Sequence, residues 1–192
     1  MAEAGTEAAP TRDRIMEAAF NVVCQHGIGR LSLEDVAREA ELSRQTVYRY
    51  FGSKQALIEA VVLREEERFI ARILSATDEH ADVRPALEAA ITAALVAARE
   101  HPLLDRLLAT EPEALLPLLM TGKGPVLPAA RTALEALFAR RLPHLSPSDA
   151  WGVADATTRL FISYAINPPE DSSEAVAAGL ADLILNGLKS PY

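Results

Sequence analysis

The strongest constraint on the fold lies between residues 32 and 52, where two short helical patterns are separated by a turn of about three residues. Ser32 begins the first pattern, and Asp35 follows it in the spacing of a capping box. Ser43 can cap the second pattern, which Gly52 ends. Two short helices joined by so tight a turn predict a helix-turn-helix unit. The same corner also occurs in proteins that never bind nucleic acid, so the pattern alone leaves the function open.

Helical patterns continue on both sides of this unit. One follows Pro10 and ends at Gly27, and a long one begins after Ser53. Beyond residue 80, Ala- and Leu-rich segments alternate with prolines, and no strand-like alternation is convincing. The sequence therefore predicts an all-α protein, with an N-terminal three-helix head joined by a long helix to a C-terminal helical domain. We expect a disordered lead at 1–10, a helix-turn-helix domain at 11–56, a second domain at 57–192, and later helices at 83–99, 102–110, 112–120, 125–142, 147–166 and 171–188.

Cysteine, histidine and motif content argue against several function classes. The single cysteine, Cys24, cannot form an internal disulfide, and the four histidines lack the spacing of a zinc site, so we expect no metal and no cofactor. No nucleophile elbow, phosphate loop or carboxylate pair beside a histidine indicates an enzyme. The chain shows neither a secretory leader nor an apolar run of the roughly 20 residues that cross a bilayer. We therefore expect a soluble cytoplasmic protein without catalytic activity.

Charge is distributed unevenly along the chain. The formal net charge is -8, yet residues 11–64 contain eight Lys or Arg against seven acids, which leaves -9 on the rest. Within this region the stretch LSRQTVYRYFGSKQAL, residues 42–57, holds three cations, two tyrosines and no acid. An acidic protein with one locally cationic end suits contact with a polyanion, because the rest is repelled and non-specific binding is limited. A merely solvated basic surface would have the same composition.

The expected third helix has an apolar side and a polar side. At about 100° per residue, Val47 and Phe51 share the side that packs on the first two helices. The outer side carries groups suited to base edges, since Arg pairs with guanine, Gln with adenine, and the Thr methyl packs on thymine. Tyrosine, lysine and the amides of a helix N-terminus suit phosphates. The candidate DNA-binding residues are Arg44, Gln45, Thr46 and Arg49 for bases, Tyr48, Tyr50 and Lys54 for phosphates, and Ser32 and Ser43 at helix N-termini. A polar-faced connecting helix is the alternative.

Residues 11–62 resemble the N-terminal DNA-binding domain of TetR-family transcriptional regulators. Their sequence is TRDRIMEAAFNVVCQHGIGRLSLEDVAREAELSRQTVYRYFGSKQALIEAVV. The resemblance covers the order of the elements, the opening at Ile15 to Ala19, the LSLEDVA segment and the specific TVYRYFGSKQAL block. It implies a homodimer on a palindromic double-stranded DNA operator, with a C-terminal domain that dimerises and binds a small-molecule effector. It also implies a recognition helix at Ser43 to Tyr50, with phosphate contacts at Tyr48 and Lys54.

A regulator of this kind is expected to be a repressor that its effector releases from DNA. An activator of the same family is one alternative. A helical small-molecule-binding or adaptor protein that does not bind DNA is another, although it leaves the cationic head unexplained.

The C-terminal half offers weaker signals. Asp171 and Glu174 open the last helix in capping-box spacing, and an apolar stripe follows that suits a dimer interface or the core of a monomer. Polar groups embedded in apolar helices are candidates for an effector pocket, although such residues more often belong to a core. The run Glu65–Glu67 points in successive directions on a helix and predicts a solvated face. The interface candidates are Val176, Leu180, Leu183 and Ile184, and the pocket candidates are His101, Met120, Trp151, Asp155, Thr158 and Phe161.

Overall fold

The structure is a computed structural model that describes residues 4–120, 124 and 126–187. Within these residues all regular secondary structure is helical, which confirms the predicted fold class. The chain divides into two compact units. The first contains the residues up to Glu65 together with Pro102–Leu115, and the second contains Glu66–His101 together with the residues from Leu116 onward. Two helices, α4 (Lys54–Asp78) and α7 (Pro112–Met120), contribute residues to both units.

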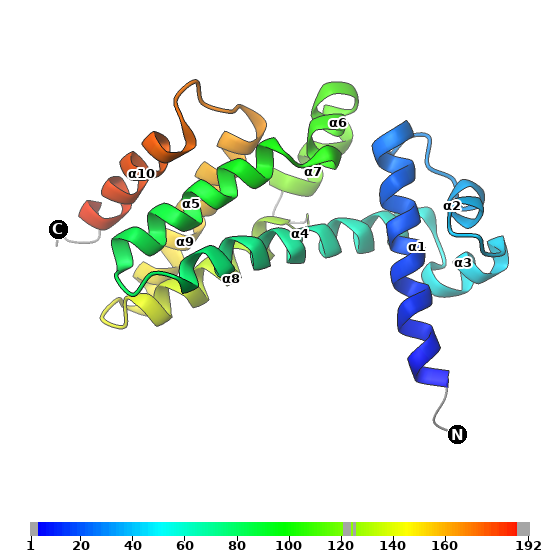
Figure 1. Ribbon diagram of the computed structural model, residues 1–192, viewed down its shortest axis with the longest axis horizontal. Coiled ribbons are helices and arrows are strands. Elements are labelled where there is room, and N and C mark those ends of the chain that lie inside the picture. The colour runs from blue at the N-terminus through cyan, green and yellow to red at the C-terminus, as the bar shows by residue number, and fades with distance from the viewer. Residues whose placement is uncertain (1–3, 121–123, 125, 188–192) are drawn as a thin grey trace. The chain divides into compact units, whose positions relative to one another are not determined.

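The first unit combines three consecutive helices with a fourth from later in the chain. Figure 1 shows α1, α2 and α3 packed together, and α6 contacts α1 within the same unit. Side chains with no exposed surface form the centre of the three-helix head, among them Ile15, Val36, Val47 and Leu57. The helices are α1 (Ala4–His26), α2 (Leu33–Glu39), α3 (Arg44–Phe51) and α6 (Pro102–Thr110), with the first part of α4.

The first helix begins earlier than the sequence pattern predicts. α1 starts at Ala4 rather than after Pro10, so the expected disordered lead is helical from Ala4 onward. Pro10 lies inside the helix, where its missing N–H removes one backbone hydrogen bond. The flanking Ala and Glu residues have high helix propensity, which favours continuation through the proline. The start expected at Pro10 and Thr11 was therefore wrong.

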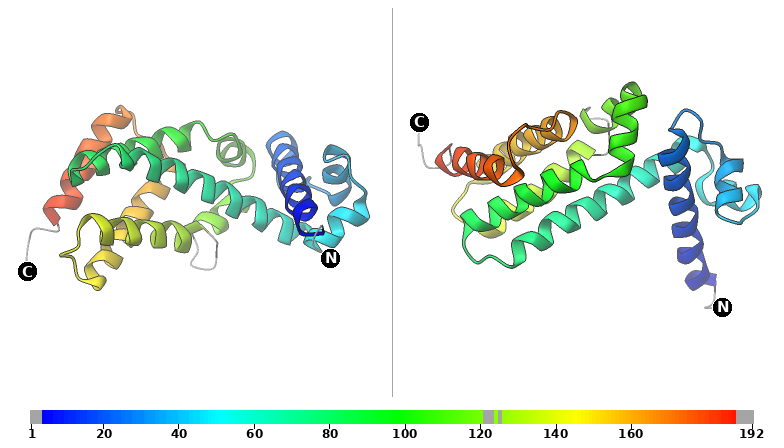
Figure 2. Two further views of the ribbon diagram at one scale, coloured as in Figure 1. Left: turned by 60° about the horizontal axis from the view of Figure 1, so that its bottom comes forward. Right: turned by 45° about the horizontal axis from the view of Figure 1, so that its top comes forward.

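The second unit is a bundle in which α10 packs along α5 and α9 packs along α8, as Figures 1 and 2 show. Its core includes Leu87, Ile91, Phe138 and Leu180. The observed bounds of α5, α6 and α7 coincide with the predicted helices at 83–99, 102–110 and 112–120. The remaining helices are α5 (Val83–Arg99), α8 (Val126–Arg141), α9 (Pro147–Ile166) and α10 (Ser173–Gly187).

The last helix has a different cap from the expected one. α10 begins at Ser173, and the Oγ of Ser172 accepts a hydrogen bond from the Ala175 amide at 3.2 Å. Asp171 lies in the preceding loop, where its carbonyl oxygen accepts a hydrogen bond from Arg99 at 3.4 Å. The capping box expected from Asp171 and Glu174 was therefore wrong, because a long-range arginine contact holds Asp171 outside the helix.

The acidic run on α4 is also not a solvated face. Glu65 and Glu66 are both buried, and only Glu67 of the three is exposed. Arg64 of α4 donates to carbonyl oxygens of α1, whereas Glu66 is affected by the backbone of Ala130 in α8, so successive α4 positions meet different helices. Glu65 forms an ion pair with Arg64 at 2.8 Å. The prediction for this run was wrong, because helical periodicity does not reveal how many sides of a long helix are covered.

Candidate nucleic-acid interface

The turn between α2 and α3 fixes the corner between these two helices. The amide of Leu42 donates to the Ala37 carbonyl at 2.8 Å, and the amide of Glu41 donates to the Arg38 carbonyl at 3.1 Å. These two bonds form a Schellman motif, which closes the end of α2. Glu41 takes the left-handed conformation that the motif requires, with φ 52°, although glycine is the usual residue there. No glycine or asparagine marks this position, so the motif could not be predicted from local residues.

α3 is anchored from one side and capped at its start. Val47 is fully buried, and the guanidinium of Arg12 lies 5.4 Å from the centre of the Phe51 ring. The Oγ of Ser43 accepts a hydrogen bond from the Thr46 amide at 3.0 Å, which confirms Ser43 as the cap. Gly52 ends the helix with φ 71°. The helix is thus held in one orientation by contacts that leave its other side open.

The open side of α3 carries four of the predicted DNA-binding side chains. Arg44, Gln45 and Arg49 are exposed, and Tyr48 retains 59% of its surface. Because α3 has no acid in its first turn, nothing within that turn offsets the partial positive charge of its N-terminus. This side of the helix therefore presents two guanidinium groups, an amide and a phenol to solvent.

Thr46 and Tyr50 flank this surface and are half-buried. The Thr46 hydroxyl lies 2.8 Å from the Ser43 hydroxyl, so its side chain is already held by the cap. The guanidinium of Arg49 lies 5.7 Å from the centre of the Tyr50 ring, within the range of a cation–π contact. Both side chains therefore help to orient their exposed neighbours.

Lys54, at the start of α4, is tied to the loop between α1 and α2. Its Nζ donates a hydrogen bond to the Gly29 carbonyl oxygen at 2.9 Å. The amide of the same glycine donates to Oε2 of Glu111 at 2.9 Å, and Glu111 precedes α7 in the same unit. A lysine ammonium has three N–H donors, so the bond to Gly29 is compatible with a phosphate contact. Sequence reasoning found Lys54 but missed Glu111, since nothing local connects it to residues near 29.

The N-terminus of α2 is less suited to phosphate than that of α3. The Ser32 Oγ accepts a hydrogen bond from the Asp35 amide at 3.1 Å and donates to its carboxylate at 2.5 Å, which confirms Ser32 as the cap. The hydrogen bond from Ser32 lowers the pKa of Asp35, with a further contribution from Arg38. Glu34 and Asp35 are thus two negative charges in the first turn, and they oppose a nearby phosphate. The predicted contact at Ser32 stays a prediction.

In the second unit, two of the pocket candidates lie around one arginine. The Arg131 guanidinium lies 5.2 Å from the centre of the Trp151 ring, and its Nη1 is 3.6 Å from Oδ1 of Asp155. Asp155 also accepts a hydrogen bond from Arg159 at 2.7 Å, which lowers its pKa. Trp151 is 48% exposed. Trp151 and Asp155 are therefore brought together around Arg131, at the surface of the unit.

Two other pocket candidates on α9 contribute to the interior of the unit. Thr158 is buried, and its hydroxyl donates to the Ala154 carbonyl at 2.8 Å. Phe161 packs against the apolar core, and His101 follows the end of α5. The side chain of Met120 lies outside the described residues.

The interface candidates on α10 divide between the two sides of that helix. Leu180 and Ile184 are buried in the core of their own unit, and Val176 packs against that core. Leu183 is 62% exposed. Of the four, Leu183 is the one whose side chain faces solvent.

Two further properties concern the residues that the structure describes. Within them, no group of three or more His, Cys, Asp or Glu side chains is arranged to bind a metal ion. None of the helices in the same residues combines the length and the apolar character needed to cross a membrane.

Comparison with known families and proteins gives consistent matches over both units. A family model described as bacterial regulatory proteins, tetR family, matches residues 15–61. A second model, described as bacterial Tetracyclin repressor, C-terminal domain, matches residues 82–186. Residues 15–61 include the whole of α2 and α3, so the first match covers the exposed surface described above.

Two relatives and one solved structure illustrate the extent of the similarity. The HTH-type transcriptional regulator AlkX of Mycobacterium tuberculosis is 31% identical over 176 residues, which are 90% of this chain and 82% of the relative. UidR of Escherichia coli is 40% identical over 67 residues, or 35% of this chain and 34% of the relative. The crystal structure of the TetR family repressor AlkX from Dietzia sp., implicated in biodegradation of n-alkanes, has a TM-score of 0.73 and 29% identity over 93% of this chain and 95% of that one.

Proposed function

The chain belongs to the TetR family of bacterial transcriptional regulators, and from that premise we propose that it represses transcription as a homodimer on a palindromic operator and is released by a small molecule. It is a DNA-binding regulator with a helix-turn-helix head. The repressor role, the homodimer and the effector are the proposed parts. The proposed cycle takes place on cytoplasmic DNA and contains no catalytic step.

The single observation that carries the proposal is the two-sided character of α3. Val47 is fully buried in the head, while Arg44, Gln45 and Arg49 are exposed on the same helix. A helix anchored in this way can enter the major groove, where Arg and Gln form bidentate hydrogen bonds with guanine and adenine. We therefore propose that Arg44, Gln45, Thr46 and Arg49 read bases.

Phosphate contacts would fix the position of α3 in the groove. We propose that Tyr48, Tyr50, Lys54 and the α3 N-terminus at Ser43 supply them, since Tyr48 is exposed and the first turn of α3 lacks acids. Ser32 is the weakest of the predicted contacts because Glu34 and Asp35 lie in the same turn.

Two-fold pairing would bring two heads to one operator. We propose that the outer sides of α9 and α10 form the contact, supported by the exposed apolar side chains of Trp151 and Leu183. The contact would be isologous, and the two recognition helices would lie about 34–36 Å apart, one turn of DNA.

The effector would act through the second unit. The Dietzia AlkX repressor is implicated in biodegradation of n-alkanes, which supports a mainly apolar effector for this chain. Because α4 contributes residues to both units, a ligand that shifts α4 in the second unit would also act on the first. Its effect on DNA affinity would equal its difference in affinity between the two states, commonly about 1–3 kcal/mol.

The test is fluorescence anisotropy with a labelled duplex from the region upstream of the protein's own coding sequence, compared with a random duplex at about 50 and 200 mM salt. Arg44→Ala is expected to weaken binding to the specific duplex by about 5- to 150-fold and to leave binding to the random duplex nearly unchanged. Lys54→Ala is expected to weaken both alike and to reduce the salt slope by about 1.

The matched control is Arg72→Ala, which removes one exposed cation from the second unit and is expected to leave the preference between the two duplexes unchanged. Equal losses on both duplexes for Arg44→Ala would show that Arg44 reads no base. A wild type with no preference for any upstream duplex over random DNA would overturn the proposed function.

A further inference from the structure

Glu66 is a buried carboxylate whose oxygens lack partners. It lies on α4 in the second unit and retains 7% of its surface. Neither Oε1 nor Oε2 has a hydrogen-bond partner. Burying a polar group without a hydrogen bond is unfavourable, and more so when the group is ionised. Glu66 therefore lowers the stability of the chain on its own, unlike the buried Glu65, which is paired with Arg64.

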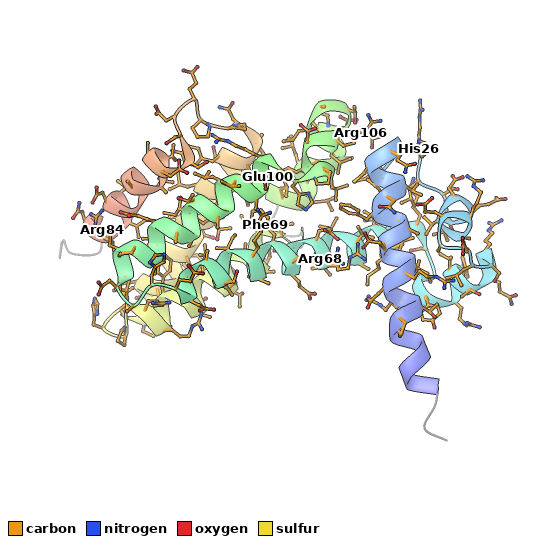
Figure 3. The ribbon with its side chains drawn as sticks, in the orientation of Figure 1. His26, Arg68, Phe69, Arg84, Glu100 and Arg106 are labelled. Carbon is orange, nitrogen blue, oxygen red and sulfur yellow. The ribbon has the colours of Figure 1, made fainter. Side chains whose placement is uncertain are left out.

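The residues that follow Glu66 on α4 lead into an apolar cluster. Phe69, labelled in Figure 3, lies one turn further along α4, followed by Ile73. These two side chains pack against Ala90 and Ala94 of α5 and Phe161 of α9. The Ala130 backbone of α8 favours the ionised carboxylate and opposes the rise of its pKa, but it forms no hydrogen bond with either oxygen. Glu66 thus lies one helical turn before an apolar cluster on the same helix, and small-molecule sites are usually apolar with a few polar groups.

The charges around Glu66 favour a cation. Burial raises the pKa of Glu66 to about 7, the Ala130 backbone opposes this, and the negative charge of Glu67 adds to it. On α8, the next residue, Arg131, is engaged with Asp155 and Trp151. The side chains of the apolar cluster on α5 and α9 are uncharged. A positive group would offset the burial of the carboxylate, which is the largest cause of the raised pKa.

We propose that Glu66 binds the ammonium group of an apolar amine effector, whose hydrocarbon part packs on the cluster of Phe69, Ile73 and Phe161. An ammonium supplies three N–H donors and a charge, so it can satisfy both oxygens of Glu66. An alcohol supplies one donor and leaves the second oxygen without a partner. A carboxylate ligand would place a second negative charge beside Glu66. The inference rests on the proposed effector site in the second unit and names its chemistry.

A residue on α4 is well placed to link effector recognition to the first unit. α4 begins at Lys54 in the first unit and is continuous through Glu66. An ion pair at Glu66 would bind directly to the helix that carries Lys54. Recognition through a residue on α5, α8 or α10 would need a further contact to reach that helix.

The experiment is isothermal titration calorimetry of the full chain at about pH 8, one unit above the raised pKa, so that the carboxylate is mostly ionised. The ligands are octylamine, 1-octanol and octanoate, which share one chain length. The variants are Glu66→Gln, which keeps the shape and removes the charge, and Glu67→Gln, which removes a neighbouring exposed charge. A second substitution at the same position, Glu66→Ala, is included as well. A cooperative thermal unfolding transition, measured for each protein, shows that the variant is folded.

Wild type is expected to bind octylamine at least about tenfold more tightly than octanol or octanoate, as a buried charge-assisted hydrogen bond requires. Glu66→Gln and Glu66→Ala are expected to lose this preference, and Glu67→Gln is expected to keep it within about threefold. The inference is overturned if octylamine does not bind the wild type, if octanol or octanoate binds as tightly, or if Glu66→Gln keeps the amine affinity.

A parallel DNA-binding titration separates this inference from the proposed function. If octanoate or octanol releases the specific duplex equally from wild type and from Glu66→Gln, the proposed regulator function is supported and the amine site is rejected. Binding of octylamine at Glu66 without any change in DNA affinity would support the site and reject its role in release.

Discussion

The two units of this protein hold their chemically distinctive side chains in opposite ways. In the first unit, Arg44, Gln45 and Arg49 stand on the open side of a helix that is fixed by its own cap and by one buried valine. In the second unit, Glu66 is buried and its oxygens lack partners. Exposed groups cost the fold little, whereas a buried unpartnered carboxylate lowers stability. We therefore expect substitutions at the DNA surface to change binding alone, and substitutions around Glu66 to change stability as well.

The largest expected effect tests whether the second unit depends on one packed core. Phe138→Ala removes a fully buried ring from α8 and is expected to lower the free energy of unfolding by about 3–5 kcal/mol. Hydrogen exchange followed by mass spectrometry should show the loss of protection in α5, α8, α9 and α10.

Leu183→Ala, on the exposed side of α10, is the control and should change stability by no more than about 0.5 kcal/mol. An equal loss of protection in α1, α2 and α3 after Phe138→Ala would break the comparison, because the two units would then unfold as one.

The second effect concerns the pH dependence of stability. The pKa of Glu66 rises from 4.5 to about 7 on folding, so the folded state holds this proton more tightly. Wild type should therefore lose stability as the pH rises from about 4.5 to 7, and then level off. Glu66→Gln removes this loss and is expected to be more stable by on the order of 2–3 kcal/mol at pH 8, with a smaller difference near pH 5.

Urea denaturation at the two pH values measures this difference, and Glu67→Gln is the control. Glu67 is exposed, so its substitution should change stability by less than about 0.5 kcal/mol. A difference between Glu66→Gln and wild type that does not grow with pH would contradict the burial of an unpartnered carboxylate.

The third effect tests a glycine that the first unit requires. Gly27 has φ 86°, and a Cβ atom there would overlap Oε1 of Glu111, whose Oε2 binds the Gly29 amide. Gly27→Ala is expected to lower stability by about 1–2 kcal/mol, through backbone strain and the weakened Glu111 contact. Thermal unfolding checks the size of the loss.

The matched substitution in the second unit should have the opposite sign. Gly152 lies inside α9 with no atom near the position of an added Cβ. Gly152→Ala should therefore raise stability by about 0.5–1 kcal/mol, as alanine does within helices. If Gly27→Ala and Gly152→Ala change the stability equally, the two glycines do not differ in the way that their backbone conformations predict.

The smallest effect is expected at the turn of the helix-turn-helix. Glu41 occupies a left-handed position, which costs a residue with a side chain about 1 kcal/mol relative to glycine. Glu41→Gly is expected to raise stability by about 0.5–1 kcal/mol while keeping the backbone bonds of Leu42 and Glu41. Denaturant titration is the measurement, and Glu39→Gly, at the last residue of α2, should instead lower the stability by roughly 0.5–1 kcal/mol.

Sequence patterns predicted those features that depend on neighbouring residues. The caps at Ser32, Ser43 and Ser53 involve an amide three residues further along the chain, and all three form. The bounds of α5, α6 and α7 also follow from local prolines and helix-forming residues. The exposed side of α3 was predictable because one apolar position, Val47, determines which side faces inward.

Patterns failed where distant residues decide the outcome. The burial of Glu65 and Glu66 depends on residues distant in the sequence, and the loop position of Asp171 depends on Arg99. Leu180 and Ile184 fit an interface stripe equally well, yet they pack inside their own unit because α10 lies on α5. Periodicity identifies an apolar side but does not specify which partner covers it.

The composition of the first unit has a consequence for engineering. That unit includes Pro102–Leu115, so the polypeptide leaves the head along α4 and returns to it through α6. A chimera joined at a single point within α4 would place a foreign α6 against α1 and a foreign residue at the Glu111 contact with Gly29. Transplanting the DNA specificity of this protein onto another sensor therefore requires two exchanged segments, and a simple fusion would yield a mismatched hybrid.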